Sequence, residues 1–399
     1  MPNIMDYLDW RGDLTMSVSP FNEVDNLILA QVSYINFKNI VHGIESEDSI
    51  SVKEAAALFC EIHSGLEVKS WTSIVKVSVE LLKKMARCPR FSDLKLSKYV
   101  DTIDYEEEKQ FSAINIALED GTVYVAYRGT DDTIIGWKED FNMSFMPIVP
   151  AQIEAVKYLM DTAGKASRKI RIGGHSKGGN LAVFAAMKCP SYIKENIIEI
   201  YNNDGPGFDR EIISSKEYKE IRDKIKTIVP QTSIVGMLME HEEEYSVVKS
   251  NQKHIMQHYA MSWEVLGKQF VHVDSVTKES RMLDIILKAW VDKMGAAQRE
   301  RFVDSMFCLL EALGIKSIKD LTNNKLRRMT QIGKIISSMP AENKEVLTKA
   351  IKLILMEGGK VLRYGNKQNE ISSYARADSK KVIKYLPIMR KNRINNSAS

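Results

Sequence analysis

The sequence has no long apolar run and few cysteines, and both absences restrict what the protein can be. No stretch approaches the ~20 apolar residues that a membrane-spanning helix needs. The amino terminus lacks a basic segment followed by roughly 7 or more apolar residues, so a secretory signal is not expected. The four cysteines are widely spaced and include no Cys-x-x-Cys pair for a metal or redox centre. We therefore expect a cytoplasmic protein with buried free thiols and without a metal or other cofactor.

The excess of positive charge is also small. A formal net charge of +4 on 399 residues is too little for a phosphate-binding surface over the whole molecule, so nucleic acid is not the expected partner. Hydrophobic residues make up 44% and charged residues 27%, a balance typical of folded globular proteins. No internal repeat with a period of roughly 20 to 50 residues is visible. The length allows one large domain and a smaller companion.

The first part of the chain has a helical pattern. Apolar residues recur at three- and four-residue steps over 21–37, and a capping-box pattern at Ser51 and Glu54 precedes a second helix. A third helix is expected over 71–85. Two strand-like segments then bracket Asp120-Gly121, a dipeptide suited to a tight hairpin. The sequence thus predicts a helical preface followed by two antiparallel strands.

Strand and helix patterns alternate from residue 151 onward, as they do in a mainly parallel sheet flanked by helices. The expected elements are a helix over 151–160, a strand over 169–173, a helix over 178–187, a strand over 197–202, a helix over 210–225 and a strand over 226–229. The fold class is therefore α/β, and we assign residues 1–275 to this domain. Amphipathic segments follow over 283–293, 299–313, 326–338 and 343–356, so residues 276–399 are expected to form a helical C-terminal region.

The end of the C-terminal region is basic. Its positive residues are Lys380, Lys381, Lys384, Arg390, Lys391 and Arg393, around the apolar Val382, Ile383 and Leu386. Such a segment could rest on an acidic partner or on the anionic lipid of a membrane surface. A solvated, frayed tail explains the same residues and is the favoured interpretation, because chain termini are usually loose.

One segment has the pattern of a catalytic turn. An apolar strand ending at Gly173 runs into Gly-His-Ser-Lys-Gly at 174–178, and a helix of small residues follows. This order is the nucleophile elbow of the α/β-hydrolase fold, in which a sharp turn exposes the serine hydroxyl at the carboxyl edge of the sheet. Ser176 is the candidate nucleophile, and the helix N-terminus adds positive potential where an oxyanion would form. The alternative is an ordinary turn, because the pentapeptide alone arises by chance about one time in ten.

A second motif lies upstream of the elbow. The strand over 123–127 ends in Arg-Gly-Thr at 128–130, and Trp-Lys-Glu-Asp follows at 137–140. In the α/β-hydrolase fold, a loop after the third strand and the residue after the nucleophile each donate a backbone N–H to the oxyanion. Thr130 and Lys177 occupy these positions and are the candidate oxyanion hole.

The two linked motifs resemble those of the class 3 (fungal-type) lipases, in which Arg-Gly-Ser/Thr and Trp-x-x-Asp precede a Gly-His-Ser-x-Gly-Gly elbow. A closer likeness is to an uncharacterised bacterial α/β-hydrolase family related to these lipases, and it covers most of residues 1 to 275. The matching segments are Tyr7-Leu-Asp-Trp-Arg-Gly-Asp, Pro20-Phe-Asn-Glu-Val-Asp-Asn, Asn203-Asp-Gly-Pro-Gly-Phe, Ser233-Ile-Val-Gly and Gln257-His258. The resemblance implies a lipase-like or esterase-like hydrolase and no particular substrate. Arg128 as a buried charge and Trp137 as a core residue are structural alternatives.

A serine hydroxyl needs a base, which in this fold follows the last strands. Four of the seven histidines are set aside because they precede the sheet, lie inside the elbow with the ring expected to turn away, or belong to an acidic loop expected to be solvated: His42, His63, His175 and His241. The remaining candidates are His254, His258 and His272. We choose His258, because a loop before the expected strand over 270–273 can fold back over the serine and because it matches the family's Gln-His. A histidine that only packs in a loop is the alternative.

The acid of the triad has two candidates. Class 3 lipases carry an aspartate after the strand that corresponds to 225–230, and this chain has Gln231-Thr-Ser there instead. Asp204, at the end of the preceding strand, could orient the imidazole. Its Asn-Asp-Gly-Pro context is strong turn chemistry, so a purely structural role for Asp204 is an equal alternative. Ser233 could instead support the histidine, which would make a weaker hydrolase.

These assignments predict the hydrolysis of a carboxylic ester or thioester of a small molecule or lipid. His258 would deprotonate Ser176, and water would release the acyl group. The alternative is a catalytically weak or inactive scaffold of the same fold that binds protein or lipid, as the missing aspartate and the helical C-terminal region suggest.

Overall fold

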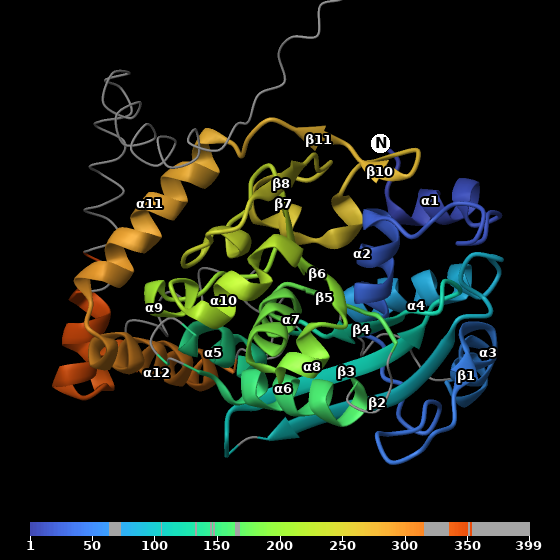
Figure 1. The fold of residues 1–399 in the computed structure, drawn as a ribbon. Helices are drawn as coiled ribbons and strands as arrows, with labels where there is room; N and C mark the ends of the chain where they lie inside the picture. Colours follow the sequence, from blue (N-terminus) through green and yellow to red (C-terminus); the bar gives the residue numbers. More distant parts are fainter. Residues whose placement is uncertain are drawn as a thin grey trace, which may run out of the picture.

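The computed structural model describes residues 1–63, 73–104, 106–131, 134–143, 146, 148–163, 168–314, 335–349 and 352. Within them a nine-stranded sheet crosses the molecule and helices cover both of its faces (Figure 1). None of the helices in these residues is both long and apolar enough to span a membrane. The basic segment around Lys380 to Arg393 and most of the helix expected over 326–338 lie outside the described residues.

The sheet is mixed rather than mainly parallel. Its strands are β1 (Ile50–Ser51), β2 (Lys95–Asp104), β3 (Lys109–Ala117), β4 (Val123–Tyr127), β5 (Ile170–His175), β6 (Ile197–Asn203), β7 (Ile225–Pro230), β8 (Tyr245–Val248) and β11 (His272–Val273), in the order β1-β2-β3-β4-β5-β6-β7-β8-β11. Neighbours from β4 to β8 pair in parallel, whereas β1 to β4 and the β8–β11 pair are antiparallel. The two antiparallel strands expected on either side of Asp120-Gly121 are β3 and β4. The sequence analysis did not predict β1 or β2; a short connection joins β2 to β3 and reverses the chain.

Two hydrophobic cores lie on opposite faces of this sheet. One face carries α1 (Ile4–Arg11), α2 (Glu23–Val32), α3 (Val52–Ile62) and α4 (Ser73–Met85), and the other carries α6 (Pro150–Ala163), α7 (Lys177–Lys188), α8 (Ser191–Lys194) and α10 (Lys216–Ile221). Alternation along β4 feeds both cores: Tyr124 and Ala126 belong to the first, Val125 and Tyr127 to the second. The sheet is therefore covered on both faces by helices, and the loops lie at the ends of its strands.

Several elements differ from the sequence expectation. The helix expected over 210–225 is divided into α9 (Arg210–Ile213), α10 and a 3-10 turn, η2 (Arg222–Lys224). The strand expected over 270–273 is divided between β10 (Gln269–Phe270), which pairs with β9 (Val265–Leu266), and β11. The thiols are free but not all buried, since Cys60 and Cys308 are exposed. The spacing of apolar residues does not reveal such breaks, because two short helices or strands can show the same spacing as one longer element.

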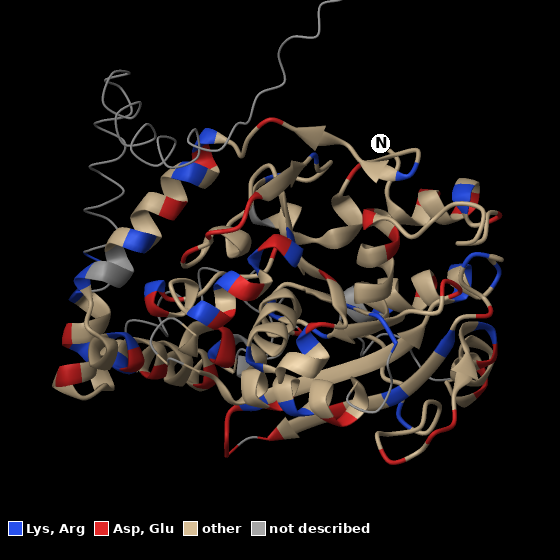
Figure 2. Cartoon of the chain, viewed as in Figure 1, with Lys and Arg blue, Asp and Glu red and all other residues tan. Residues whose placement is uncertain are grey.

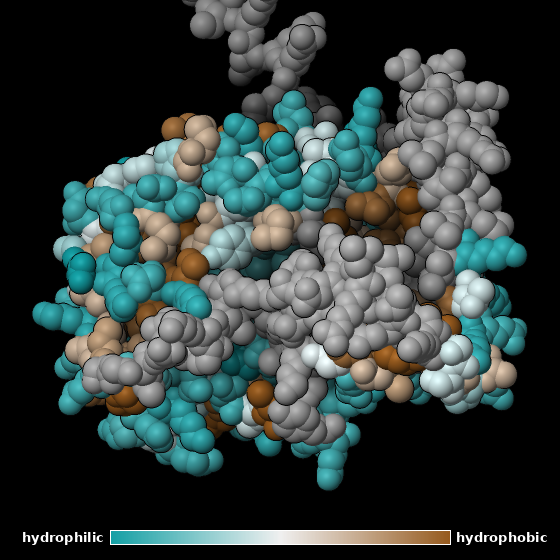
Figure 3. Space-filling model, turned by 180° about the vertical axis from the view of Figure 1, so that it is seen from behind, coloured by the Kyte–Doolittle hydropathy of each residue, from teal (hydrophilic) through white to brown (hydrophobic). Residues whose placement is uncertain are grey.

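The C-terminal helices form a third core and contact the main domain. α11 (Lys278–Lys293) and α12 (Ala296–Ala312) extend to one side, where α12 lies beside α5 (Ile134–Asn142) (Figure 1). Phe307 of α12 stacks edge-on against Phe141 with ring centroids 5.9 Å apart, and Asp304 pairs with Lys138 at 3.0 Å. Charges of both signs are interspersed along these helices (Figure 2). Seen from behind, hydrophilic side chains interrupt the apolar patches of the visible face (Figure 3).

A buried ion pair ties α2 to the segment after α4. Arg90 Nη2 lies 2.5 Å from Asp25 Oδ2, and both side chains are fully buried. Arg90 also donates hydrogen bonds to the carbonyls of Leu14 and Ser19. A buried charge with this many partners is satisfied, and removing either partner would leave the other unpaired in the core.

The turn between β5 and α7 is strained. Ser176 has φ 58° and ψ −134°, a region that residues other than glycine rarely adopt. Its flanking glycines are required by packing, because a Cβ on Gly174 would lie 2.3 Å from the Gly178 carbonyl carbon and one on Gly178 would lie 2.2 Å from the Tyr127 oxygen. The backbone therefore holds the Ser176 side chain in a conformation that the surrounding structure imposes.

This strain predicts an unusual order of stabilities at position 176. Ser176→Gly should unfold with a free energy about 1 kcal/mol higher than Ser176→Ala, because strain of roughly 1–3 kcal/mol is relieved and the entropy cost of glycine is smaller. Urea unfolding of the two variants measures the difference. The same pair at Ser214, where φ is −80°, is the control and should show alanine as the more stable. Equal stabilities of Ser176→Gly and Ser176→Ala would mean that the turn stores no strain.

Candidate active site

The candidate residues follow the ends of neighbouring parallel strands. Thr130 follows β4, Ser176 follows β5, Asp204 follows β6 and Ser233 follows β7. Because the carboxyl ends of parallel strands meet at one edge of a sheet, this order brings the loops to one edge. Ser176 is largely buried there, and its backbone N–H donates to the Asn203 carbonyl at 2.9 Å.

A hydrogen bond joins two of the candidates. His258 Nδ1 lies 2.7 Å from Asp204 Oδ2, and the Asp204 side chain is fully buried. The other carboxylate oxygen accepts from Ser233 Oγ at 2.5 Å and from the Gly236 N–H at 3.2 Å. With its Nδ1 proton donated to the carboxylate, a neutral imidazole presents an unprotonated Nε2, which is the arrangement a general base needs.

The loop that carries His258 is anchored through its backbone and its neighbour. His258 ends a short 3-10 helix, η4 (His254–His258). The Gln257 side chain accepts from the Thr232 N–H at 2.7 Å and donates to the Gln252 carbonyl at 3.0 Å. The Trp263 indole donates to the Gln257 carbonyl at 2.9 Å. In the Gln-His pair of the sequence, Gln257 thus anchors the loop, and this anchoring positions His258.

The ring of His175 was expected to turn away from the site, and this expectation was wrong. Its ring centroid lies 4.7 Å from that of His258, and its Nε2 lies 2.8 Å from the His258 carbonyl oxygen. Burial, assisted by the nearby His258, lowers the pKa of His175 to about 3, so the ring is neutral near pH 7. Its single proton must then be on Nε2, and Nδ1 accepts from the Tyr34 hydroxyl at 3.2 Å. The residue before Ser176 therefore supports the loop that carries His258.

The loop after β4 passes directly against the elbow. A Cβ on Gly129 would lie 3.1 Å from Ser176 Cβ and 2.3 Å from the His175 carbonyl oxygen, so this position is restricted to glycine. Thr130 Oγ1 lies 2.7 Å from both carboxylate oxygens of Asp140. Burial raises the pKa of Asp140 to about 6, Lys177, Thr130 and His258 lower it, and Glu139 raises it further. Thr130, Lys177 and His258 therefore all lie near one carboxylate.

Other sequence candidates lie elsewhere or have structural partners. His272 Nε2 lies 2.8 Å from Glu23. His241 is not in a solvated loop, because its Nδ1 lies 2.9 Å from the buried Glu243. Burial favours a high pKa for Glu243, but His241 and two hydroxyl donors lower it to about 2. Arg128 is a buried charge that pairs with Asp101 at 2.9 Å, and the side chain of Trp137 lies outside the described residues.

The sequence analysis did not identify two residues that hydrogen-bond to the candidate site residues or their neighbours, Asp140 and Tyr34. Asp140 belongs to the quoted Trp-x-x-Asp motif, which was a signal for its bond to Thr130. Nothing local marks Tyr34 as a partner of His175, since the two are far apart in the chain. Ser176 Oγ and His258 Nε2 are not hydrogen-bonded to each other, and neither atom bonds to any other described residue. Among the same residues no three His, Cys, Asp or Glu side chains are grouped as metal ligands would be.

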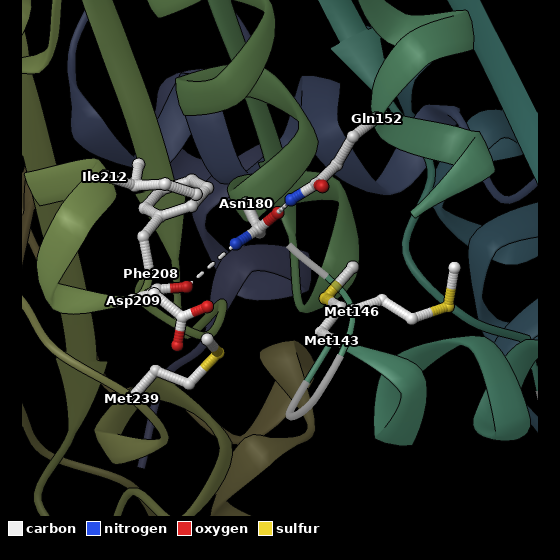
Figure 4. A pocket seen from close by; sticks show the side chains of 9 residues that line it. Met143, Met146, Gln152, Asn180, Phe208, Asp209, Ile212 and Met239 are labelled. Atoms are coloured by element: carbon white, nitrogen blue, oxygen red, sulfur yellow. Dashed lines mark hydrogen bonds between the residues drawn. The ribbon is translucent and has the colours of Figure 1, made fainter. Parts of the chain in front are cut away.

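A small cavity lies beside α7, one turn beyond the serine. Its lining residues are Met143, Met146, Gln152, Asn180, Gly207, Phe208, Asp209, Ile212 and Met239 (Figure 4). Asn180 organises the wall, because its Nδ2 donates to the Gly207 carbonyl at 3.0 Å and its Oδ1 accepts from Gln152 at 2.8 Å. The cavity volume of about 10 Å³ is roughly the room of one water molecule. An acyl chain would need this wall to move.

Comparison with solved structures finds lipases of low identity. The Rhizomucor miehei lipase propeptide complex is 21% identical, with a TM-score of 0.30, over 39% of this chain and 57% of that chain. The M37 lipase is 18% identical, with a TM-score of 0.32, over 53% of this chain and 68% of that chain. A fungal lipase-inhibitor complex is 15% identical, with a TM-score of 0.32, over 43% of this chain and 70% of that chain. The chain thus spans little more than half the length of the Rhizomucor protein.

Comparison at the level of the sequence identifies a family. No curated protein matches the chain. The Mbeg1-like family model matches residues 85–308, a segment that contains Thr130, Ser176, Asp204 and His258 and makes up more than half of the 399 residues. The chain belongs to the Mbeg1-like family.

Proposed function

We propose that the protein is a serine hydrolase that cleaves a carboxylic ester or thioester. The observation that carries the proposal is the 2.7 Å hydrogen bond between His258 Nδ1 and Asp204 Oδ2, in a loop whose carbonyl is held by the residue before Ser176. Nucleophilic acyl transfer uses a serine and a histidine that is oriented by a buried carboxylate; here the serine is on a strained turn, and the residue before it contacts the histidine. The ester of a small molecule or lipid is the proposed substrate.

The proposed reaction uses the candidate residues in the usual order. His258 Nε2 takes the hydroxyl proton as Ser176 Oγ bonds to the acyl carbon, and the proton then passes to the leaving alcohol or thiol. The backbone N–H groups of Lys177 and Thr130 stabilise the oxyanion. Water, deprotonated by the same histidine, attacks the acyl-enzyme and releases the acid. The N-terminus of α7 adds to the stabilisation, because the helix begins at Lys177 and the positive end of its dipole therefore lies at the oxyanion.

The proposed acid comes from the end of β6 instead of β7. Asp204 has φ 53°, and its N–H donates to the Ile228 carbonyl at 2.8 Å, which turns the chain at the strand end. The hydroxyl of Ser233, which follows β7, donates to the Asp204 carboxylate. The serine that follows β7 thus supports an aspartate contributed one strand earlier. Both interpretations of Asp204, as a turn residue and as the acid, are compatible in this geometry.

A binding scaffold without turnover is the second candidate function. It is favoured by the burial of Ser176, which is 7% exposed, and by the small cavity beside α7. A substrate could reach the hydroxyl only after the loops around it rearrange. Activity measurements on the intact protein distinguish the two functions.

The nucleophile assignment predicts covalent labelling at one serine. A fluorophosphonate probe should add to Ser176 of the wild type, because the proposed histidine base activates its hydroxyl. Intact-mass and peptide analysis detect the adduct, which should be lost in Ser176→Ala and retained in Ser214→Ala. Equal turnover of a p-nitrophenyl ester by the wild type and Ser176→Ala, without labelling, would favour the scaffold.

The Asp204–His258 bond predicts a large effect of a small substitution. Asp204→Asn should lower kcat by on the order of 10²–10⁴-fold, because an amide cannot hold the imidazole in the required tautomer and charge state. Steady-state kinetics with a p-nitrophenyl ester measure the change. Asp209→Asn is the matched control, since Asp209 lies five residues later in the chain, lines the small cavity and does not bond to His258. A kcat for Asp204→Asn within twofold of the wild type would remove Asp204 from the triad.

A further inference from the structure

Lys177 carries a charge into the protein interior. Its Nζ lies 2.5 Å from Glu139 Oε2 and 3.0 Å from the Gln110 carbonyl oxygen, and the two charged side chains are 1% and 0% exposed. Glu139 in turn accepts from the N–H groups of Ala151 at 3.0 Å and Gln110 at 3.2 Å. Both charged groups therefore have hydrogen-bond partners besides each other.

Stability alone does not account for such a pair. Two charges taken from water lose their hydration, and apolar side chains of similar volume often stabilise a core equally well or better. The pair lies between the first residue of α7 and the middle of α5, at the exit of the strained turn. Because buried ion pairs often add little net stability, the position of this pair beside the candidate oxyanion hole suggests a role in the geometry of the site.

Two successive residues of α5 hold the two candidate oxyanion donors. Glu139 binds the side chain of Lys177, whose backbone N–H is one candidate donor. Asp140 binds the side chain of Thr130, whose backbone N–H is the other. α5 therefore links the two halves of the candidate oxyanion hole, although these halves come from different loops.

We propose that the Lys177–Glu139 ion pair positions the oxyanion hole by coupling the elbow to the helix that orients Thr130. This inference rests on the proposed ester hydrolysis. Lys177 thus has two roles, since its backbone N–H faces the oxyanion and its side chain fixes where that N–H lies. An oxyanion hole acts through donors that are held in place before the reaction, so a looser tie lowers kcat more than it changes substrate binding.

Burial raises the pKa of Asp140, and the ammonium group of Lys177 lowers it. Besides burial, the groups with the largest effects on the pKa of this carboxyl group are Lys177, Thr130, Glu139 and His258, and Tyr34 also interacts with it electrostatically. Lys177 is the strongest of those that lower the pKa of Asp140, which burial raises to about 6. An ionised Asp140 accepts a hydrogen bond from the Thr130 hydroxyl group, whereas a protonated carboxyl group loses part of this acceptor capacity. Removing Lys177 raises the pKa of Asp140, so the active form should require a higher pH.

The experiment compares a double substitution that removes both buried charges with a single substitution that removes only the carboxylate of Glu139. Lys177→Met together with Glu139→Gln should lower kcat by on the order of 10- to 100-fold with KM within about twofold, as expected for weakened oxyanion stabilisation. The acid limb of the kcat–pH profile should move to higher pH. Glu139→Gln alone keeps the lysine and removes a group that raises the pKa of Asp140, so its acid limb should move to lower pH.

The control removes another fully buried ion pair in the amino-terminal helical layer. Arg90→Met together with Asp25→Asn should leave kcat per folded molecule and the acid limb as in the wild type, with folding followed by circular dichroism.

Opposite shifts of the acid limb in the two Glu139 variants support the proposal. An active wild type with an unchanged profile in both variants would overturn the positioning role alone. A wild type with neither turnover nor labelling at Ser176 would overturn the proposed hydrolase and this inference with it. If the Lys177→Met and Glu139→Gln double variant does not fold, the single Glu139→Gln variant decides: a downward shift supports the role and no shift overturns it.

Discussion

The candidate site depends on one hydrogen bond between segments that are distant in sequence. His258 Nδ1 and Asp204 Oδ2 lie 2.7 Å apart, and the carboxylate has no contact with bulk water. A buried carboxylate is costly unless donors surround it, and Ser233, Gly236 and the imidazole supply these donors. The loops after β6, β7 and β8 are thus joined at one charged group. This carboxylate is the hydrogen-bond partner of the imidazole ring, and the ring of His175 packs against the same imidazole.

The elbow adds a constraint of a different kind. Its strain is in the backbone, and close packing keeps it there: Gly129, Gly174 and Gly178 each meet main-chain atoms where a Cβ would be. The same packing brings the loop after β4 within contact of Ser176. Strained residues persist where the surrounding structure determines them from several sides, and such places are common at functional sites. The turn and the hydrogen-bonded carboxylate are therefore two independent structural constraints on the candidate site.

The sequence predicted what depends on local pattern. The order of strand, glycine-rich turn and helix around Ser176 was readable, as was the hairpin at Gly121, where φ is 82°. The antiparallel pairs that β1, β2 and β11 make at the two sides of the sheet were missed, because the alternation of elements does not indicate the pairing direction of edge strands. The roles of His175 and His241 were missed for a related reason. Whether an imidazole is solvated or held by Tyr34 or Glu243 is decided by segments that no local window contains.

The described helices divide the support of the site between them. α2 lies against β5 and carries the chain to Tyr34, which bonds to His175, and α5 holds Thr130 and Lys177. α5 itself is contacted from outside by α12, through Phe307 and Asp304. The residues of α5 that face α12, Lys138 and Phe141, flank Glu139 and Asp140, which face the elbow and the loop after β4. Because a helix turns successive side chains to different sides, α5 can contact the C-terminal helices and the candidate oxyanion hole at once. The C-terminal helices are therefore part of the packing that holds this helix, and through it the two candidate donors.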